Sequence, residues 1–309
     1  MRRSFLWLAL AAIGFVVLLI VAPSAAAAGW RLAFVTAGAP FAGAVLMLLV
    51  ARVVGARWDW FGPLAGAAPV LAVAAIGIGL VQLAAPAPPH LGLWQQPIAV
   101  GIRAVIAAAA LAWAGARVLR GASATFAAIA LAVYAVVSTA IGSDWLIGGS
   151  PGHAVSAIGM ILFAEELGAA CAVVLVLGWG DVRFRRDMGM LLIAAGLGLS
   201  YMFFMDFLIL WYGDLPAKIG WYVDRATPLY DLIVALALIL GLLVPIAAQA
   251  LRNEARGQRI AGMSALVALV LIDLWWVEAD LLAVLAAICA GGLMVAAGVL
   301  LGDRRHVHG

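Results

Sequence analysis

Long apolar stretches separated by short polar joints run through the entire chain of 309 residues. A helix needs about 20 mostly apolar residues to cross the hydrocarbon core of a bilayer. About ten windows meet this requirement: 4–23, 32–51, 63–84, 98–116, 124–142, 153–179, 188–212, 228–250, 260–277 and 281–301. No window shows the strict alternation typical of strands. The pattern predicts an all-α polytopic membrane protein, with residues 1–309 forming a single integral membrane domain.

Composition excludes a soluble domain. Hydrophobic side chains make up 67% of the residues and charged ones 11%, with a mean hydropathy of +1.16, so too few polar groups exist to cover a water-facing surface. Cys171 and Cys289 lie in separate windows without CxxC spacing, which argues against an iron–sulfur cluster, covalent haem or a zinc site in this chain. The net charge of +3 comes from arginines in the joints and does not indicate nucleic-acid binding.

The basic residues orient the predicted spans. Of the 18 Lys and Arg residues, most fall on one face: Arg2, Arg3, Arg52, Arg57, Arg117, Arg120, Arg183, Arg185, Arg186, Arg252, Arg256, Arg259, Arg304 and Arg305. The positive-inside rule makes this face cytoplasmic, together with both termini. The first window has an alternative interpretation, because a basic start, an apolar run and the small residues of PSAAAAG (Pro23–Gly29) also resemble a secretory signal.

Four acidic residues within the apolar windows are the main candidates for polar chemistry, in addition to Asp231 near the start of the window 228–250. Asp206 and Asp273 lie in the outer halves of their windows, six and four residues before the outer ends. Glu165 and Glu166 are about twelve residues into the window 153–179, which places them near the bilayer midplane. Adjacent residues on a helix diverge by about 100°, so only one of these two glutamates can face a given pocket.

Ionisable groups inside a membrane are expensive and are functional candidates by default. One hypothesis is a proton track that descends from the outer face through Asp231, Asp273 and Asp206 to Glu165 or Glu166. The alternative is that each acid only fixes helix packing. Its partner would then be an arginine or hydroxyl group, and the candidates are Arg103, Arg225, Ser138, Thr139, Ser200 and Tyr201.

Histidines are too few and too peripheral for a bis-histidine haem within the membrane. Two of the four, His306 and His308, are in the tail, while His90 lies in an outer joint and His153 begins the sixth window. Aromatic residues gather at the predicted outer ends of the spans, where the headgroup zone favours amphipathic rings. They are Trp30, Trp94, Trp145, Trp211, Tyr212, Trp221 and Tyr222.

Two segments resemble a known family. LILWYGDLPAKIGWYVDR (Leu208–Arg225) and SDWLIGGSPGHAVSAIGMILFAEELGAA (Ser143–Ala170) are similar to signature segments of the ActF-type membrane subunit of bacterial alternative complex III. Weaker similarities are GARWDWF (Gly55–Phe61) and IDLWW (Ile272–Trp276). In order and spacing, these segments are distributed over most of the chain, from Gly55 to Trp276.

The resemblance implies a relative of the polysulfide reductase (NrfD-like) membrane subunits. Its fold would have two four-helix bundles, built from spans two to five (32–142) and six to nine (153–277), flanked by the first and tenth spans. The implied function is that of a subunit of a quinol:cytochrome c oxidoreductase in the bacterial inner membrane, structural and proton-conducting. Outer-mouth or quinone-site candidates are Trp211, Tyr212, Arg225, Asp144 and His153.

The resemblance also implies cofactors and partners. This chain would bind no haem or metal itself, and quinol is its one candidate ligand. Partners would be a homologous quinol-binding membrane subunit, an iron–sulfur subunit and multi-haem and mono-haem cytochromes c, with a terminal cytochrome oxidase as a further candidate. The iron–sulfur clusters and haem c would reside in those partners.

Departures from the family pattern favour a proton role over a quinone site. Ala217 and Lys218 replace paired glutamates, Gly152 and His153 replace a histidine and a tryptophan, and Asp206 replaces a neutral glutamine. A proton-coupled secondary transporter and a purely structural anchor remain as alternatives. Many transporters have a pair of interrupted spans in corresponding positions of their two halves. Pro69 and Pro245 each interrupt one span but do not form such a pair, which argues against a transporter.

Overall fold

All regular structure in the described part of the chain is helical. The computed structural model describes residues 2–84, 96–147, 157–213, 216–251, 254–277 and 279–306, and no strand occurs among them. The α-helices are α1 (Arg2–Val21), α2 (Pro23–Val54), α3 (Gly62–Ala67), α4 (Pro69–Ala84), α5 (Pro97–Leu119), α6 (Ala124–Gly142), α7 (Ile158–Leu177), α8 (Val182–Tyr212), α9 (Pro216–Arg225), α10 (Pro228–Leu238), α11 (Val244–Gln249), α12 (Glu254–Val277) and α13 (Leu281–His306). A 3₁₀ turn, η1 (Asp59–Phe61), and two π-helical turns, η3 (Ser143–Ile147) and η4 (Ile239–Leu243), complete the set.

The predicted spans are confirmed as helices. Within the described residues, 9 helical stretches are long and apolar enough to cross a membrane, and Trp7–Val21 of α1 is a shorter apolar helix. The window 63–84 is divided into α3 and α4 at Pro69, and the π turn η4 precedes Pro245 in the window 228–250. Both irregularities follow from proline, which lacks the N–H group that a continuous helix requires. The chain is therefore an all-α polytopic membrane protein.

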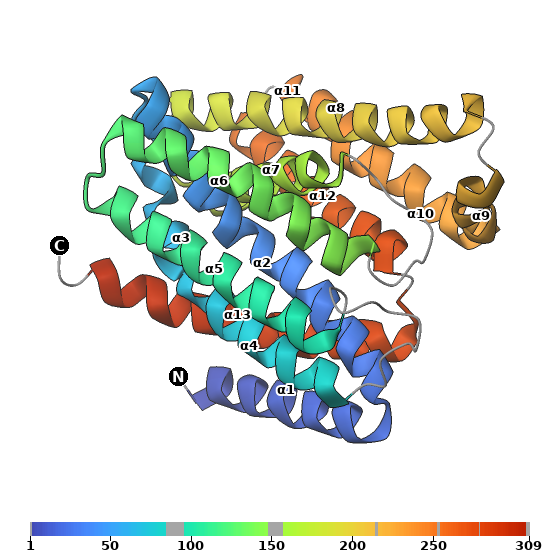
Figure 1. Cartoon of the computed structure of the whole chain (residues 1–309). Coiled ribbons are helices and arrows are strands. Elements are labelled where there is room, and N and C mark those ends of the chain that lie inside the picture. The colour runs from blue at the N-terminus through green and yellow to red at the C-terminus, as the bar shows by residue number, and fades with distance from the viewer. Residues whose placement is uncertain are drawn as a thin grey trace.

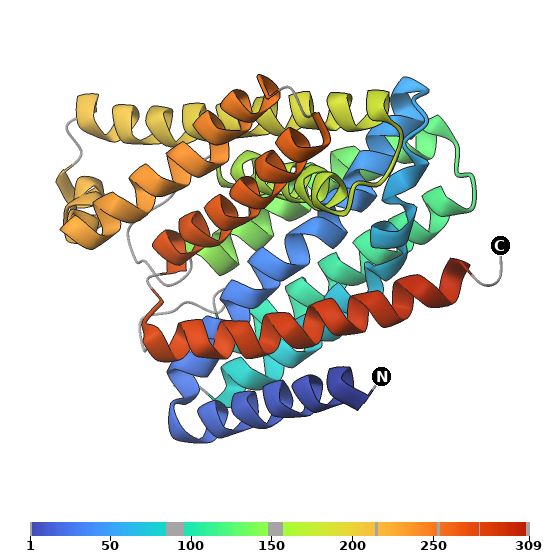
Figure 2. The same cartoon turned by 180° about the vertical axis from the view of Figure 1, so that it is seen from behind.

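Helix α2 forms the centre of the molecule and packs against α13, α7, α4 and α6 (Figures 1 and 2). Two glycines allow these close approaches. A Cβ atom at Gly43 would collide with the backbone carbonyl of Glu166 on α7, and one at Gly29 would collide with that of Ala283 on α13. Small residues thus replace side-chain interdigitation at the tightest crossings, as is common between membrane helices.

Helix α7 joins the two predicted bundles. It packs against α2 and α6 on one side and against α8 and α12 on the other. Gly262 of α12 brings that helix onto α7, because a Cβ there would lie 2.6 Å from the carbonyl oxygen of Ala172. The division into bundles at 32–142 and 153–277 remains a prediction, and the peripheral helix α1 packs on α13 and α2.

The first and last helices share one end of the molecule. Helix α1 begins, and α13 ends, at the end opposite α9 (Figures 1 and 2). This arrangement agrees with an even number of crossings. That the shared end faces the cytoplasm remains a prediction from the arginine distribution.

Candidate functional site: two cavities on either side of helix α7

A cavity of about 710 Å³ lies between α7, α8, α9, α10 with η4, and α12. Its walls are mostly apolar, with a cluster of aromatic rings from Phe203, Phe204, Phe207, Tyr222 and Trp275. Polar side chains are few: Glu165, Ser200, Tyr222, Arg225 and Asp231. The last three belong to α9 and α10, so polar groups lie at the α9 end of the cavity while Glu165 reaches it from the middle of α7.

Two buried carboxyl groups lie on the facing helices α7 and α12 beside this cavity. The side chain of Glu165 lines it although the residue is only 3% exposed, and Asp273 of α12 is 0% exposed. In the described part of the chain, neither Oε1 of Glu165 nor either carboxyl oxygen of Asp273 has a hydrogen-bond partner. The two groups are close enough to interact electrostatically. Two neighbouring acids away from water cannot both ionise at low cost, so the pair favours a state that keeps at least one proton.

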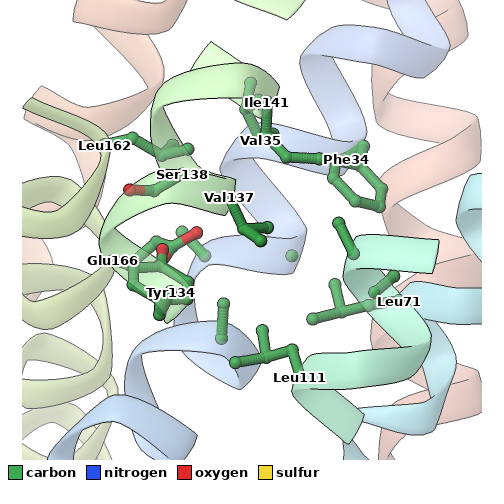
Figure 3. A pocket seen from close by; sticks show the side chains of 15 residues that line it. Phe34, Val35, Leu71, Leu111, Tyr134, Val137, Ser138, Ile141, Leu162 and Glu166 are labelled. Carbon is green, nitrogen blue, oxygen red and sulfur yellow. The ribbon is translucent and has the colours of Figure 1, made fainter. Parts of the chain in front are cut away.

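Glu166 faces a different cavity. This smaller space, about 50 Å³, lies between α2, α4, α5, α6 and α7 and is lined by Glu166, Tyr134 and Ser138 among apolar neighbours (Figure 3). The hydroxyl group of Tyr134 donates a hydrogen bond to Oε2 of Glu166. The structure thus places the adjacent glutamates in separate cavities, as expected from their angular separation on the helix.

Asp206 of α8 accepts a hydrogen bond from α9, the helix that lies at one end of the large cavity. The Tyr222 hydroxyl of α9 donates to Oδ2 of Asp206 at 2.5 Å. Burial raises the pKa of Tyr222 well above its ordinary value, and the hydrogen bond to Asp206 and the charge of that residue raise it further. Asp206 itself is partly buried and is not among the residues that line the large cavity. The hydroxyl group of Tyr222 was not among the partners expected from the sequence.

Arg225 lies beside the mouth of the cavity in an aromatic cluster. Its guanidinium carbon is 3.6 Å from the ring centroid of Trp221, and it donates to the carbonyl oxygens of Trp221 and Trp275 at 3.3 and 3.4 Å. The residue is 5% exposed and lines the large cavity. Cation–π stacking and these carbonyls let α9 bury a cationic group against α12.

Asp144 forms a salt bridge and does not line either cavity. Nε and Nη2 of Arg103 donate to its two carboxyl oxygens at 2.8 and 2.7 Å. This fork-like pairing joins α5 to η3 at the predicted outer end of the first bundle. For Asp144, the geometry agrees with the packing hypothesis.

The remaining candidates are scattered. Trp211 and Tyr212 are 62% and 81% exposed and do not line the cavity, although Trp211 stacks on Phe207, which does. Asp231 is exposed at the α9 end of the cavity. His153 lies outside the described residues. Sequence reasoning missed Tyr134, whose only signal was a lone tyrosine in an otherwise apolar window.

The chain matches no protein-family model, and no curated protein matches it significantly.

Proposed function

We propose that this chain is an integral membrane subunit of a quinol:cytochrome c oxidoreductase complex, in which it conducts protons beside the quinol-oxidising subunit. The observation that carries the proton role is the large cavity, because it leads from α9 to the Glu165–Asp273 pair in the apolar interior. The resemblance of the segments Ser143–Ala170 and Leu208–Arg225 supports the choice of complex. The membrane would be the bacterial inner membrane.

In this proposal, water enters the cavity at the level of Tyr222, Arg225 and Asp231. Asp231 is exposed and supplies an acceptor at the entrance. At the deep end, Glu165 and Asp273 interact electrostatically, and a single proton exchanged at this pair avoids creating two buried charges. The cavity, at about 710 Å³, has room for a chain of water molecules between these ends.

The proposed partners supply the electron-transfer chemistry. They are an iron–sulfur subunit, multi-haem and mono-haem cytochromes c, a homologous quinol-binding membrane subunit and, at the end of the chain, a terminal oxidase. Quinol oxidation in such a complex releases protons, and a proton-conducting subunit gives them a path.

One observation favours a second candidate, a proton-coupled transporter. A cavity of about 710 Å³ is of the size that holds small organic ligands, and its aromatic walls suit a substrate with rings. A structural anchor, the third candidate, is favoured by the bonds that Asp144, Glu166 and Asp206 make to neighbouring side chains.

Affinity purification in mild detergent distinguishes the candidates. An oxidoreductase subunit is expected to copurify with haem-containing cytochromes c and an iron–sulfur protein, visible by haem absorption and mass spectrometry. Purification of the chain alone, with no haem and no iron, would contradict membership of such a complex and favour the transporter.

Substitution of Glu165 tests the proton role within the complex. Glu165→Gln keeps the size of the side chain and removes its titratable proton, so proton transfer coupled to quinol oxidation is expected to slow by roughly 100-fold or more. Glu254→Gln is the matched control, since Glu254 is exposed at the start of α12. Equal proton transfer in the two variants would show that the large cavity is not the path.

A further inference from the structure

We propose that an anionic phospholipid binds at the end of the molecule opposite α9, where its phosphate group lies between Arg52 of α2 and Arg120 at the end of α5. Its acyl chains lie along the exposed apolar face of α5. This binding site is independent of the proposed proton role, because neither arginine lines either cavity.

The arginine cluster consists of four exposed arginines at this end. Arg52 is in the last turn of α2, and Arg57 follows that helix. Arg117 is in the last turn of α5, and Arg120 ends it. Nη2 of Arg52 lies 3.9 Å from the place of a Cβ atom at Gly121, so its guanidinium group reaches the turn after Arg120 (Figure 1). Two segments distant in sequence therefore bring cations to one place.

Acidic groups do not balance the arginine cluster. The segments 52–62 and 113–124 contain its four arginines and a single acid, Asp59. Among the described residues, no salt bridge joins Asp59 or another acid to the cluster. Arg117 stacks on Phe126 of α6, with its guanidinium carbon 5.7 Å from the ring centroid, and thereby fastens α5 to α6. The cluster keeps a net positive charge that attracts an anion.

The backbone itself closes the two helix ends beside the cluster. Gly55 has a left-handed φ of 72°, and its N–H group and that of Ala56 donate to the carbonyl oxygen of Ala51. At the end of α5, the N–H group of Ala122 donates to the carbonyl oxygen of Arg117. These carbonyls need no side-chain cap. Capping therefore does not occupy the guanidinium groups of the cluster.

One exposed face of α5 leads from the apolar interior of the bilayer to the cluster. Ile106, Trp113, Arg117 and Arg120 recur at intervals of seven, four and three residues, which places them on one side of the helix. Ile106 and Trp113 are 64% and 60% exposed. An apolar strip that ends in cations matches an amphiphile whose acyl chains lie below an anionic head group.

This combination favours a phospholipid over a soluble anion. A guanidinium group can bind two phosphate oxygens through parallel hydrogen bonds. A free phosphate ion would make no contact with Ile106 or Trp113, whereas a lipid covers both. The end that carries the cluster is the one predicted to be cytoplasmic, where anionic lipids are concentrated and basic sites on membrane helices bind their head groups.

Native mass spectrometry of the purified full-length chain tests the site, with phosphatidylglycerol as the probe. Arg52→Gln and Arg120→Gln each remove one cation and are expected to weaken binding about fivefold, the factor that corresponds to about 1 kcal/mol per basic residue. Arg259→Gln is the matched control, since Arg259 is an exposed arginine near the start of α12. This control should bind the lipid like the wild-type protein.

A second pair of variants tests the apolar part of the site. Trp113→Ala should lower the fraction of protein that retains phosphatidylglycerol. Trp7→Ala on α1 is its control, because Trp7 is 70% exposed and lies outside the proposed site. Retention should be unchanged in this control.

Three results would overturn the proposal. Equal weakening by Arg259→Gln and the two cluster variants would show only a diffuse attraction of the basic face. Displacement of the lipid by an equal concentration of glycerol phosphate would identify the ligand as a soluble phosphate. Equal retention of phosphatidylcholine and phosphatidylglycerol would show that the site does not read the charge of the head group.

Thermal unfolding keeps the proposal testable if a variant does not accumulate. Phosphatidylglycerol should raise the Tm of the wild-type protein more than phosphatidylcholine does, because a ligand that binds the folded state stabilises it. Sodium chloride at about 1 M should remove this difference by screening the arginines. The same Tm with both lipids at low salt would contradict the site.

Discussion

At the scale of single residues, the immediate neighbours of each buried acid decide its role. Asp144 is paired with Arg103, and Asp206 and Glu166 accept hydrogen bonds from tyrosines. Glu165 and Asp273 keep unpartnered oxygens within the described residues. A satisfied acid fixes helices together, whereas an unsatisfied buried acid requires water or a proton. The residue type alone does not distinguish these cases.

The Tyr222–Asp206 bond leads to a prediction about alkaline stability. The folded protein raises the pKa of Tyr222 above its ordinary value of 10, so the folded state retains the phenol proton more strongly than the unfolded state. The contribution of the neutral Tyr222 phenol to the free energy of unfolding is therefore complete below pH 10. It is lost as the pH rises above that value and the phenol ionises. Thermal unfolding of the wild-type protein in detergent should therefore show a loss of Tm above pH 10 that is weaker in Tyr222→Phe.

Tyr212→Phe is the control for this measurement, because it removes the same hydroxyl from a side chain that is 81% exposed. It should keep the alkaline loss of Tm seen in the wild-type protein. At neutral pH, Tyr222→Phe should be less stable by about 1–3 kcal/mol through the lost hydrogen bond to a carboxylate. An unchanged alkaline slope in Tyr222→Phe would show that ionisation of Tyr222 does not cause the alkaline loss of Tm.

At the scale of elements, helix α7 is held between two glycine contacts. Gly43 of α2 lies against the backbone at Glu166, and Gly262 of α12 lies against the backbone at Ala172. The first contact is at Glu166 itself and the second lies six residues further along α7, so the position of α7 depends on how closely the three helices approach. The irregular turn η4 contributes Gly241 and Leu242 to the wall of the large cavity.

Gly43→Ala tests this arrangement. The added methyl group would collide with the carbonyl of Glu166, and the forced separation of α2 from α7 should destabilise the protein by about 1–3 kcal/mol. Gly198→Ala in α8 is the control, because no atom lies within 4 Å of a Cβ there. Alanine replaces glycine in a helix at no steric cost at position 198, so that variant should be at least as stable as the wild-type protein in thermal unfolding. Equal Tm values for the two variants would contradict the tight α2–α7 crossing.

At the scale of the whole molecule, the helices form one assembly around α2 and α7. Helix α13 packs along α2 although the two are distant in sequence, and α1 packs on both. The ends of the first and last helices lie opposite α9 (Figures 1 and 2). The α9 end of the large cavity therefore lies towards the face that the arginine pattern predicts to be outside.

Cysteine labelling on intact cells tests this orientation. In a parent carrying Cys171→Ala and Cys289→Ala, Ala226→Cys lies between α9 and α10 and Ala124→Cys begins α6, both at exposed positions. A membrane-impermeant maleimide should label position 226 and should label position 124 only after the membrane is opened. The unsubstituted parent controls for background, and the reverse labelling pattern would show that the predicted orientation is inverted.

Much of the fold could be predicted from the sequence, but the site only in part. The predicted windows agree with the helices because both the apolar spans and their breaks at Pro69 and Pro245 depend only on neighbouring residues in the sequence. The angular divergence of Glu165 and Glu166 is also local. The hydroxyl partners of Asp206 and Glu166 were not predicted, because Tyr222 and Tyr134 come from other helices.

The sequence by itself determined that this protein consists of membrane-spanning helices and carries acidic groups at membrane depth, since length, hydropathy and residue type are written along the chain. Only the tertiary structure decided which acids are satisfied, which face a cavity and which lie close to one another. Asp273 and Glu165 interact electrostatically because α12 packs on α7, and Tyr134 bonds to Glu166 because α6 also packs on α7. The free energy of transferring a segment into the bilayer is the sum of contributions from its own residues. The pairing of polar groups depends instead on contacts between distant segments.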